Sequence, residues 1–242
     1  MTDEQRLYSI WVYLQAEPLF WLTLTIGAYL AGDFIYRRTR LFPLLNPVAI
    51  GIVIVSAVLL LFGIQYERYF DGAKFIHFLL GPATVSLAIP IYHKWDLITA
   101  NARAILTTVL LGSVFAILIT YALAVAFSLD RDIVLSLLPR SVTAPIAMGV
   151  SELIGGIPSL TAIITIVTGI IGAAFGTFTL DLLRVREMSA RGFAIGLASH
   201  GIGTARAMSR NQTAGVFAAV AMGLSGIVTA LLVPAVVFLL GI

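Results

Sequence analysis

The feature that most constrains this chain is a set of four long runs that contain no Asp, Glu, Lys or Arg. They cover residues 41–66, 104–129, 153–180 and 211–242. A helix of about 20 apolar residues crosses the roughly 30 Å hydrocarbon layer of a bilayer, and each run is at least that long. The whole chain is 60% hydrophobic and only 11% charged, a composition that water-soluble domains of this size do not have. The sequence therefore predicts an all-α, polytopic helical membrane protein.

The composition also excludes several classes of function. The net charge of +3 is spread over short connectors, so it reflects membrane topology and indicates no nucleic-acid partner. There is no cysteine for a disulfide, a redox site or a thiolate metal ligand. No His/Asp/Glu trio has metal-ligand spacing, and no phosphate-loop or Gly-x-Ser-x-Gly pattern occurs. We therefore expect no enzyme activity, no cofactor and no metal.

A single transmembrane domain is predicted over residues 1–242, in which residues 1–17 form an N-terminal extension without the basic start of a signal peptide. Six full spans are expected, at about 18–36, 44–62, 75–92, 104–127, 157–180 and 212–240. Basic residues gather in three connectors, which the positive-inside rule assigns to the cytoplasm. These connectors are 37–40, 94–103 and 184–191. The charge-neutral connector at 67–74 fits the outer side.

Two further apolar segments are too irregular to be ordinary spans. Segment 133–156 holds prolines, an Arg and a Glu, and segment 192–208 holds a His among closely spaced glycines. If 133–156 crossed completely, the basic connector 184–191 would fall outside, against the positive-inside rule. A re-entrant hairpin restores agreement, and 192–208 is interpreted in the same way, although a broken crossing helix has a similar pattern. Both segments are expected to line a substrate path.

Three separated blocks carry a resemblance to a known family. They are FPLLNPVAI (42–50), LLPRSVTAPIAMGVSELIGGIPSLTA (137–162) and ASHGIGTARAM (198–208). Together with the surrounding spans, residues 18–240 resemble the LrgB/CidB family. The resemblance implies a multi-pass protein of the bacterial cytoplasmic (inner) membrane, labelled antiholin-like and linked to murein hydrolase export and cell lysis. It also implies a small LrgA-like membrane partner.

The same resemblance implies a class of substrate. Plant relatives in the family, fused to an LrgA-like half, move glycolate and glycerate across the plastid envelope, and bacterial relatives are linked to pyruvate movement. This chain departs from the family pattern at Arg140, where Lys is common. It departs again at Ala144, where a second Thr is common.

Arg140 is the first candidate for chemistry, because a cation in an apolar segment costs roughly 2.5 kcal/mol or more unless it is paired or meets water. It could snorkel from a hairpin mouth to the interface. Alternatively, its planar guanidinium could anchor a carboxylate through two parallel hydrogen bonds. Ser141 and Thr143 follow with hydroxyl groups, and Pro145 frees backbone groups that attract anions at a helix start.

Glu152 is expected to be a second buried ion, either in a salt bridge with Arg140 or Arg206 or as a proton-carrying carboxyl. His200 is interpreted either as a packing residue or as a substrate-binding and proton-relay residue. Proton coupling is assigned to Glu152 and His200. The predicted substrate-binding residues are Asn46, Arg140, Ser141, Thr143, Pro145, Ser199, His200, Gly201, Gly203, Thr204 and Arg206.

Two classes of function remain open. One is a secondary transporter of small 2-hydroxy or 2-oxo monocarboxylates by alternating access, through exchange or proton coupling. The other is a holin- or antiholin-like protein that modulates murein hydrolase export and lysis. Buried polar residues in two interrupted segments favour the carrier, because such residues normally line a pathway. A homodimer is expected from the small-residue face of Gly169, Gly172, Ala173 and Gly176, which could equally pack within one chain.

Overall fold

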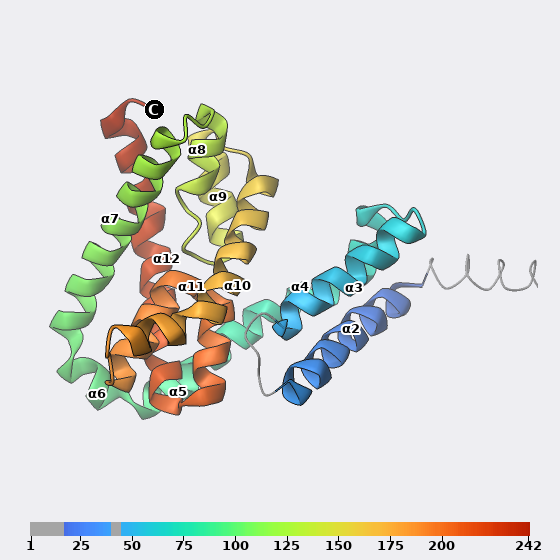
Figure 1. Cartoon of the computed structure of the whole chain (residues 1–242), viewed down its shortest axis with the longest axis horizontal. Helices are drawn as coiled ribbons and strands as arrows, with labels where there is room; N and C mark the ends of the chain where they lie inside the picture. The colour runs from blue at the N-terminus through green and yellow to red at the C-terminus, as the bar shows by residue number, and fades with distance from the viewer. Residues whose placement is uncertain (1–16, 40–44) are drawn as a thin grey trace, which may run out of the picture. The chain divides into compact units, whose positions relative to one another are not determined.

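The computed structural model of the chain describes residues 17–39 and 45–242, and the regular elements in these ranges are all helices. The chain forms two compact units, residues 1–86 and 87–242, where the sequence predicts one transmembrane domain. Residues 1–16 of the expected N-terminal extension, Arg40 and the expected start of the second span at Leu44 lie outside the described residues. Each unit is described by itself below, with the helix labels of Figure 1.

The described part of unit 1 is a set of three helices. They are α2 (Pro18–Arg38), α3 (Pro47–Leu61) and α4 (Tyr66–Ser86). Helices α2 and α3 each begin at a proline, whose fixed φ and missing N–H suit the first turn of a helix. Helix α2 packs closely on α4 at Gly72, where an added Cβ would lie 2.5 Å from the carbonyl oxygen of Pro18. Glycine is therefore required at this crossing.

Within the described ranges, five helices are long and apolar enough to cross a membrane by length and composition. They are Pro18–Arg38, Ala102–Ala126, Pro158–Leu182, Gln212–Leu240 and the stretch Tyr66–His93, which combines α4 with the short helix Ala88–His93. They correspond to five of the six predicted spans. The remaining predicted span contains α3, an apolar helix of 15 residues.

The predicted connector at 67–74 is helical, because these residues belong to helix α4. Two of its charges, Lys74 Nζ and Asp71 Oδ1, lie 3.5 Å apart on neighbouring turns. Residues three apart face the same side of a helix, so opposite charges at this spacing support helix formation. A charged stretch of this kind can therefore continue a helix and not only end one.

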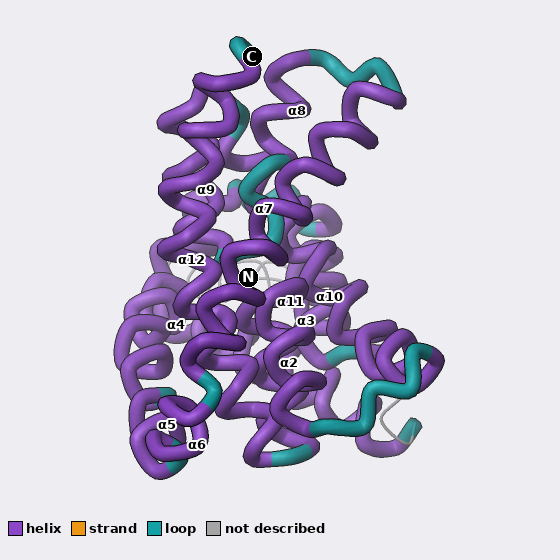
Figure 2. The backbone as a smooth tube through the Cα atoms, turned by 90° about the vertical axis from the view of Figure 1, so that its left-hand side faces the viewer, coloured by secondary structure: helices purple, strands orange, loops and turns teal. Residues whose placement is uncertain are grey.

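Unit 2 is built from eight described helices. They are α5 (Ala88–His93), α6 (Trp95–Ala100), α7 (Ala102–Ala126), α8 (Arg131–Leu137), α9 (Ala144–Ile154), α10 (Pro158–Leu182), α11 (Met188–Arg210) and α12 (Gln212–Leu240). Helix α8 and the C-terminus lie at one end of the unit, and α5 and α6 lie at the other (Figures 1 and 2). At this second end Ile98, Phe193 and Phe217 share a hydrophobic cluster. We call it the basic end, because the connectors 94–103 and 184–191 both lie there.

Helices α8 and α9, with the bend between them, form a hairpin that we call hairpin 1 (131–154). Its apex is a non-helical stretch, 138–143, which lies between the end of α8 and the start of α9 and contains Pro139. Helix α9 then returns toward the C-terminal end, since Ile146 lies against Gly226, and Ile154 belongs to the same hydrophobic cluster as Val237 on α12. Those two positions on α12 are about 16 Å apart along the helix axis. Hairpin 1 therefore enters and leaves unit 2 at the C-terminal end.

Hydrogen bonds between polar side chains hold the two limbs of hairpin 1 together. Ser136 Oγ accepts the N–H of Ile157 at 2.8 Å. Thr161 Oγ1 lies 3.0 Å from the carbonyl oxygen of Ser136 and 2.8 Å from Ser151 Oγ, so Thr161 of α10 connects the two limbs. The end of α9 is marked by Gly155, which adopts the left-handed conformation (φ 84°) that glycine accepts at no cost. The network fastens hairpin 1 to the first turn of α10.

Helix α11 forms the second hairpin, hairpin 2 (188–210), which enters from the basic end. It bends at His200, whose φ of 41° and ψ of −132° are not helical. The outbound limb lies against α12 where Gly196 meets the backbone of Ala218, and the return limb where Met208 meets Gly215. Both limbs therefore run beside the same first half of α12. This arrangement matches the predicted interruption of segment 192–208.

The small-residue face of α10 packs inside the chain, against the outbound limb of hairpin 2. Gly169 faces the ring of His200, and Gly172 faces Ser199 closely enough that an added Cβ would collide with it. Gly176 meets Ile195 at an ordinary contact distance of 3.5 Å for the added Cβ. The sequence left open whether this face packs against a second copy or within one chain. In the structure it packs within the chain, so it gives no support to a homodimer.

Candidate functional site

The apex of hairpin 1 and Leu197, which lies shortly before the bend of hairpin 2, meet at a small cavity near the middle of unit 2. The cavity is lined by Ser113, Ala116 and Ile117 of α7, Leu138 and Ser141 of hairpin 1, Leu197 of hairpin 2, and Ser225 and Thr229 of α12. Ser113 lies near the middle of α7 (Ala102–Ala126), and Ser225 lies near the middle of α12 (Gln212–Leu240). The cavity is thus near mid-length of both helices. Its volume is about 10 Å³, which is about the space needed by one water molecule.

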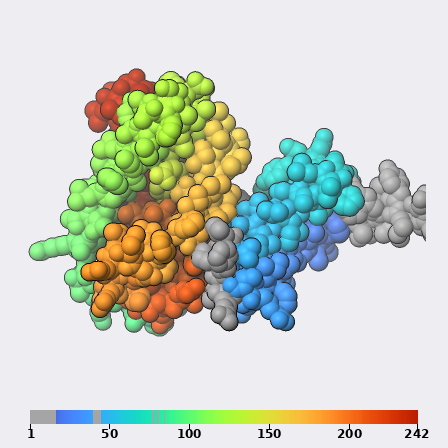
Figure 3. Space-filling model, viewed as in Figure 1, coloured from blue at the N-terminus to red at the C-terminus, as the bar shows by residue number. Residues whose placement is uncertain are grey.

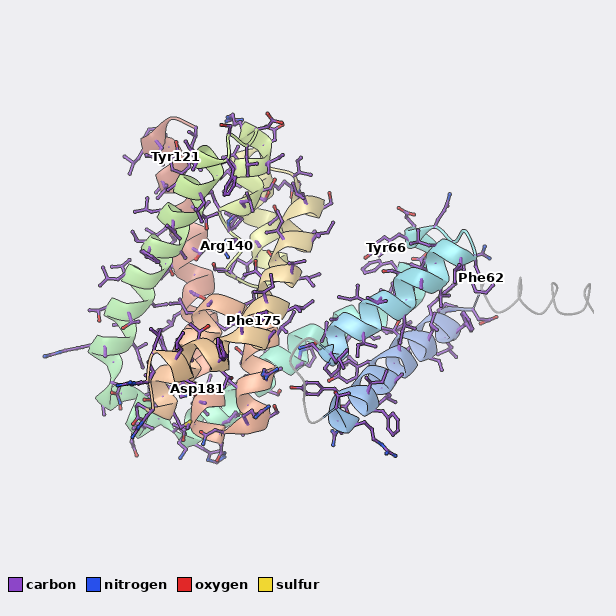
Figure 4. All side chains as sticks on the ribbon, in the orientation of Figure 1. Phe62, Tyr66, Tyr121, Arg140, Phe175 and Asp181 are labelled. Carbon is purple, nitrogen blue, oxygen red and sulfur yellow. The ribbon has the colours of Figure 1, made fainter. Side chains whose placement is uncertain are left out.

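Arg140 lies at the apex of hairpin 1, between the cavity-lining residues Leu138 and Ser141 (Figure 4). Its Nε donates a hydrogen bond of 3.1 Å to Thr120 Oγ1 on α7. Thr120 is buried and donates in turn to the carbonyl oxygen of Ala116 at 2.6 Å, so its lone pairs face the guanidinium. In the part of the chain that the structure describes, no acidic side chain lies within ion-pair distance of Arg140. One of the five N–H donors thus fixes the orientation of this cation.

His200 is buried at the bend of hairpin 2, with its ring against Gly169 of α10. Its Nε2 lies 2.9 Å from the carbonyl oxygen of Thr165, which suits the tautomer that carries the proton on Nε2. A non-glycine residue with positive φ is uncommon and often marks a functional or strained position. The contact between His200 Nε2 and the carbonyl oxygen of Thr165 therefore holds the bend of hairpin 2 against α10.

The other predicted residues of hairpin 2 lie close to this bend. Ser199 is buried beside Gly172, and Gly203 packs against Ser199 in the opposite limb. Thr204 Oγ1 donates to Met222 Sδ at 3.8 Å, and Gly201 lies near the same sulfur atom. Arg206 is half-buried on the return limb.

The remaining predicted residues lie at the N-terminal ends of helices. Thr143 is the residue before α9, and Pro145 lies in its first turn. Asn46, in unit 1, accepts the N–H of Val48 at 2.8 Å and so caps α3. A local role of this kind accounts for the side chain of Asn46, and its place in a substrate site remains a prediction.

The expectation that Glu152 is buried is wrong, because the structure exposes it. The buried face of α9 is formed by Ala147, Val150 and Ser151, at the three- and four-residue spacing of one helix side. Glu152 lies one residue further and points to the other side. The salt bridge expected between Arg140 and Glu152 is absent from the described structure, in which Arg140 contacts Thr120.

Sequence reasoning missed four polar residues near the cavity, namely Ser113, Thr120, Ser225 and Thr229. All four lie in charge-free spans that the sequence analysis treated as plain membrane helices. A signal was present on α12, where Ser225 and Thr229 are four residues apart and therefore on one face. Isolated hydroxyls in a span are common, so only their convergence on the hairpin tips distinguishes them.

Large apolar side chains cover the outer faces of the long helices. Leu111 is 69% exposed, Phe178 67% and Leu231 71%. Helices α7 and α10 form part of the outer surface of unit 2 in the space-filling view (Figure 3). Soluble proteins rarely expose apolar surface on this scale. With the five apolar helices of membrane-spanning length in the described ranges, this surface defines a polytopic helical membrane protein.

Within that class, the chain belongs to the LrgB-like family, whose model matches residues 25–239. It is 37% identical over 218 residues to the uncharacterized protein YxaC of Bacillus subtilis strain 168, covering 90% of this chain and 94% of that protein. It is 32% identical to the antiholin-like protein LrgB of the same organism, covering 93% and 97% of the two chains. The antiholin-like protein LrgB of Bacillus mycoides is also 32% identical, with 90% and 94% covered. No solved structure matches the chain.

Proposed function

We propose that this LrgB-like protein is a secondary transporter of small 2-hydroxy or 2-oxo monocarboxylates, of the size of glycolate, glycerate, lactate or pyruvate. The observation that carries the proposal is the approach of two opposed hairpins to one cavity that is lined partly by hydroxyl groups, with a cation at the apex of hairpin 1. Non-helical backbone at membrane depth is tolerated where it lines a cavity or is buried in protein. The guanidinium of Arg140 would hold the carboxylate by charge-assisted hydrogen bonds.

The order of elements in unit 2 supports transport by alternating access. Hairpin 1 and the following helix α10 cover Arg131–Leu182, and hairpin 2 and α12 cover the similarly long stretch Met188–Leu240. The two sets run in opposite directions, since one starts at the C-terminal end and the other at the basic end. Opposed repeats with interrupted segments at the midplane are a common plan of carriers. Each hairpin would then close the path from one side.

The small volume of the cavity indicates which motion the proposal needs. A space of about 10 Å³ has no room for a carboxylate anion. The tips must therefore separate for a substrate to bind, and hairpin 1 and hairpin 2 would do so in turn. Proton coupling would use His200, which is buried at the bend of hairpin 2.

An antiholin-like role is the second candidate, and the names of the relatives favour it. Two of the most similar proteins are named antiholin-like, and they match over nearly their full length. In that case the protein would modulate murein hydrolase export and lysis through partners or oligomers. A carrier whose substrate flux changes membrane energetics would reconcile both candidates.

The proposed setting is the bacterial cytoplasmic (inner) membrane, with the basic end of unit 2 in the cytoplasm. This orientation follows the positive-inside rule for the connectors 94–103 and 184–191. A homodimer and a small LrgA-like partner are part of the proposal. Neither enzyme chemistry nor a cofactor is needed for it.

The test is transport by the purified full-length protein in liposomes. Labelled glycolate, glycerate, lactate and pyruvate are offered outside, with and without unlabelled substrate or a proton gradient inside. A carrier is expected to accumulate at least one of them in a saturable way. A trapped fluorescent dye in the same vesicles is the control, because a lesion-forming protein would release it. Dye release, or no uptake of any of the four anions, would contradict the carrier.

A further inference from the structure

Most of the hydroxyl groups at the cavity come from the long helices and not from the hairpins. Ser113 of α7 and Ser225 and Thr229 of α12 line the cavity beside Ser141. Among the described residues, Ser113 Oγ is buried without a hydrogen-bond partner. Threonines of the same helix do bond to the preceding turn, as Thr120 does to the carbonyl oxygen of Ala116. A buried hydroxyl without a partner is costly, so its persistence points to a ligand.

Ser225 offers the complementary hydrogen-bonding group. Its Oγ donates to the carbonyl oxygen of Met222 at 3.1 Å, which commits its only proton. A serine hydroxyl keeps two lone pairs, so Ser225 remains an acceptor toward the cavity. Ser113, in contrast, keeps its proton to donate. The two serines thus offer one donor and one acceptor to the same small space.

We propose that Ser113 and Ser225 recognise the C2 hydroxyl of the transported anion and make the site prefer 2-hydroxy acids to 2-oxo acids and to unsubstituted acids. The inference rests on the proposed transport function. A C2 hydroxyl accepts from Ser113 and donates to Ser225. A 2-oxo oxygen can only accept, so it would meet the lone pairs of Ser225 without a proton between them. An acid without a C2 oxygen leaves the proton of Ser113 without an acceptor and the free lone pairs of Ser225 without a donor, and a site built for hydrogen bonds rejects such an analogue strongly.

The position of the cation fits this division of roles. Arg140 precedes Ser141, which lines the cavity, so a carboxylate held by the guanidinium enters beside the hydroxyl groups. In a 2-hydroxy acid the hydroxyl is on the carbon next to the carboxylate. Recognition of both groups therefore needs two neighbouring sets of side chains, one at the tip of hairpin 1 and one on α7 and α12.

A merely structural role for Ser113 predicts a lower thermal midpoint for Ser113→Ala. We expect the midpoint to stay or rise, because the Oγ of Ser113 has no partner among the described residues and its removal takes away a buried unsatisfied group. Ser136 is the matched control, since its Oγ accepts from Ile157 and donates to the carbonyl oxygen of Asp132. Ser136→Ala should lower the thermal midpoint and leave substrate preference unchanged.

The experiment compares three monocarboxylates of three carbons, namely lactate, pyruvate and propionate. Their saturable uptake is measured with the full-length protein in liposomes for wild type, Ser113→Ala, Ser225→Ala, Ser136→Ala and Thr107→Ala. Wild type is expected to prefer lactate to both other anions. Ser113→Ala should lower the lactate-to-propionate ratio by about three- to tenfold, and Ser225→Ala should remove most of the preference over pyruvate. Thr107 is exposed on α7, and its variant should match wild type.

The outcomes separate the inference from the function on which it rests. If wild type takes up none of the three anions, the transport proposal and the inference both fail. If wild type transports them without preferring lactate, or if Ser113→Ala keeps the preference, only the inference fails. A lowered ratio with an unchanged or raised thermal midpoint in Ser113→Ala supports it.

Discussion

The two hairpins of unit 2 reach one cavity from opposite ends, but they are built differently. Hairpin 1 turns through the non-helical stretch 138–143, and its limbs are closed by hydrogen bonds among Ser136, Ser151 and Thr161. Hairpin 2 turns at His200 alone, and its limbs lie on α12 through close glycine contacts. Polar bonds thus connect the limbs of hairpin 1, whereas the limbs of hairpin 2 are held on α12 mainly by steric fit.

This difference suggests a division of labour between the hairpins. The open apex of hairpin 1 places a charged side chain beside the cavity, where Arg140 is oriented by Thr120. At the bend of hairpin 2 the ring of His200 contacts the backbone of α10, and Leu197 of the same hairpin lines the cavity. Close glycine packing leaves little freedom to the limbs of hairpin 2. Hairpin 1 would therefore bind the anion at its apex, and hairpin 2 would act as a rigid body on its side of the path.

The largest expected effect is an all-or-none difference in labelling, which tests the opposite approach of the hairpins. The chain has no cysteine, so single cysteines can be introduced without a background. A cysteine at Glu187, before hairpin 2, should resist an impermeant thiol reagent added outside intact cells. A cysteine at Asp132, at the start of hairpin 1, should react. Equal labelling of both would contradict the opposed hairpins.

The next effect concerns the charge at the tip of hairpin 1. Arg140→Ala should lower saturable uptake about 100-fold or more, because a buried charge-assisted carboxylate contact is lost. Arg140→Lys, which keeps the charge and loses the fork, should lower it less. Arg186→Ala, an exposed arginine in the basic connector, is the control. A folded Arg140→Ala protein with wild-type uptake would remove Arg140 from the site.

A third prediction compares one glycine from each hairpin. An added Cβ at Gly196 of hairpin 2 would collide with the carbonyl oxygen of Ala218, whereas nothing lies within 4 Å of one at Gly149 of hairpin 1. Gly196→Ala should therefore destabilise the fold by about 1–3 kcal/mol or more. Gly149→Ala should be neutral or stabilising by up to about 1 kcal/mol, since alanine is the better helix former. Thermal unfolding in detergent measures both, and equal midpoints would contradict the steric account of hairpin 2.

The smallest effect is expected at Thr120, which orients Arg140 without touching the cavity. Thr120→Val keeps the size of the side chain and removes the acceptor of the Arg140 Nε bond. The apparent KM should rise about three- to tenfold, with maximal uptake and thermal midpoint little changed. Ala at the same position should add a packing defect and lower the midpoint. An unchanged KM in Thr120→Val would show that the hydrogen bond does not prepare the site.

The sequence by itself determined the class of the protein and the location of its interruptions. Charge-free runs specify apolar helices because hydrophobic length is a local property of the chain. Prolines before and after Arg140, and glycines around His200, likewise act on the backbone where they stand. Both hairpins could therefore be located without the structure.

Only the tertiary structure decided which side chains face one another. It placed Glu152 on the exposed face of α9, and it packed the glycines of α10 against hairpin 2 of the same chain. It also brought Ser113 and Ser225, which lie far apart in the sequence, to one cavity with the tip of hairpin 1. A single residue gives no sign of its distant neighbours, because the direction of a side chain depends on how its helix is rotated against the others.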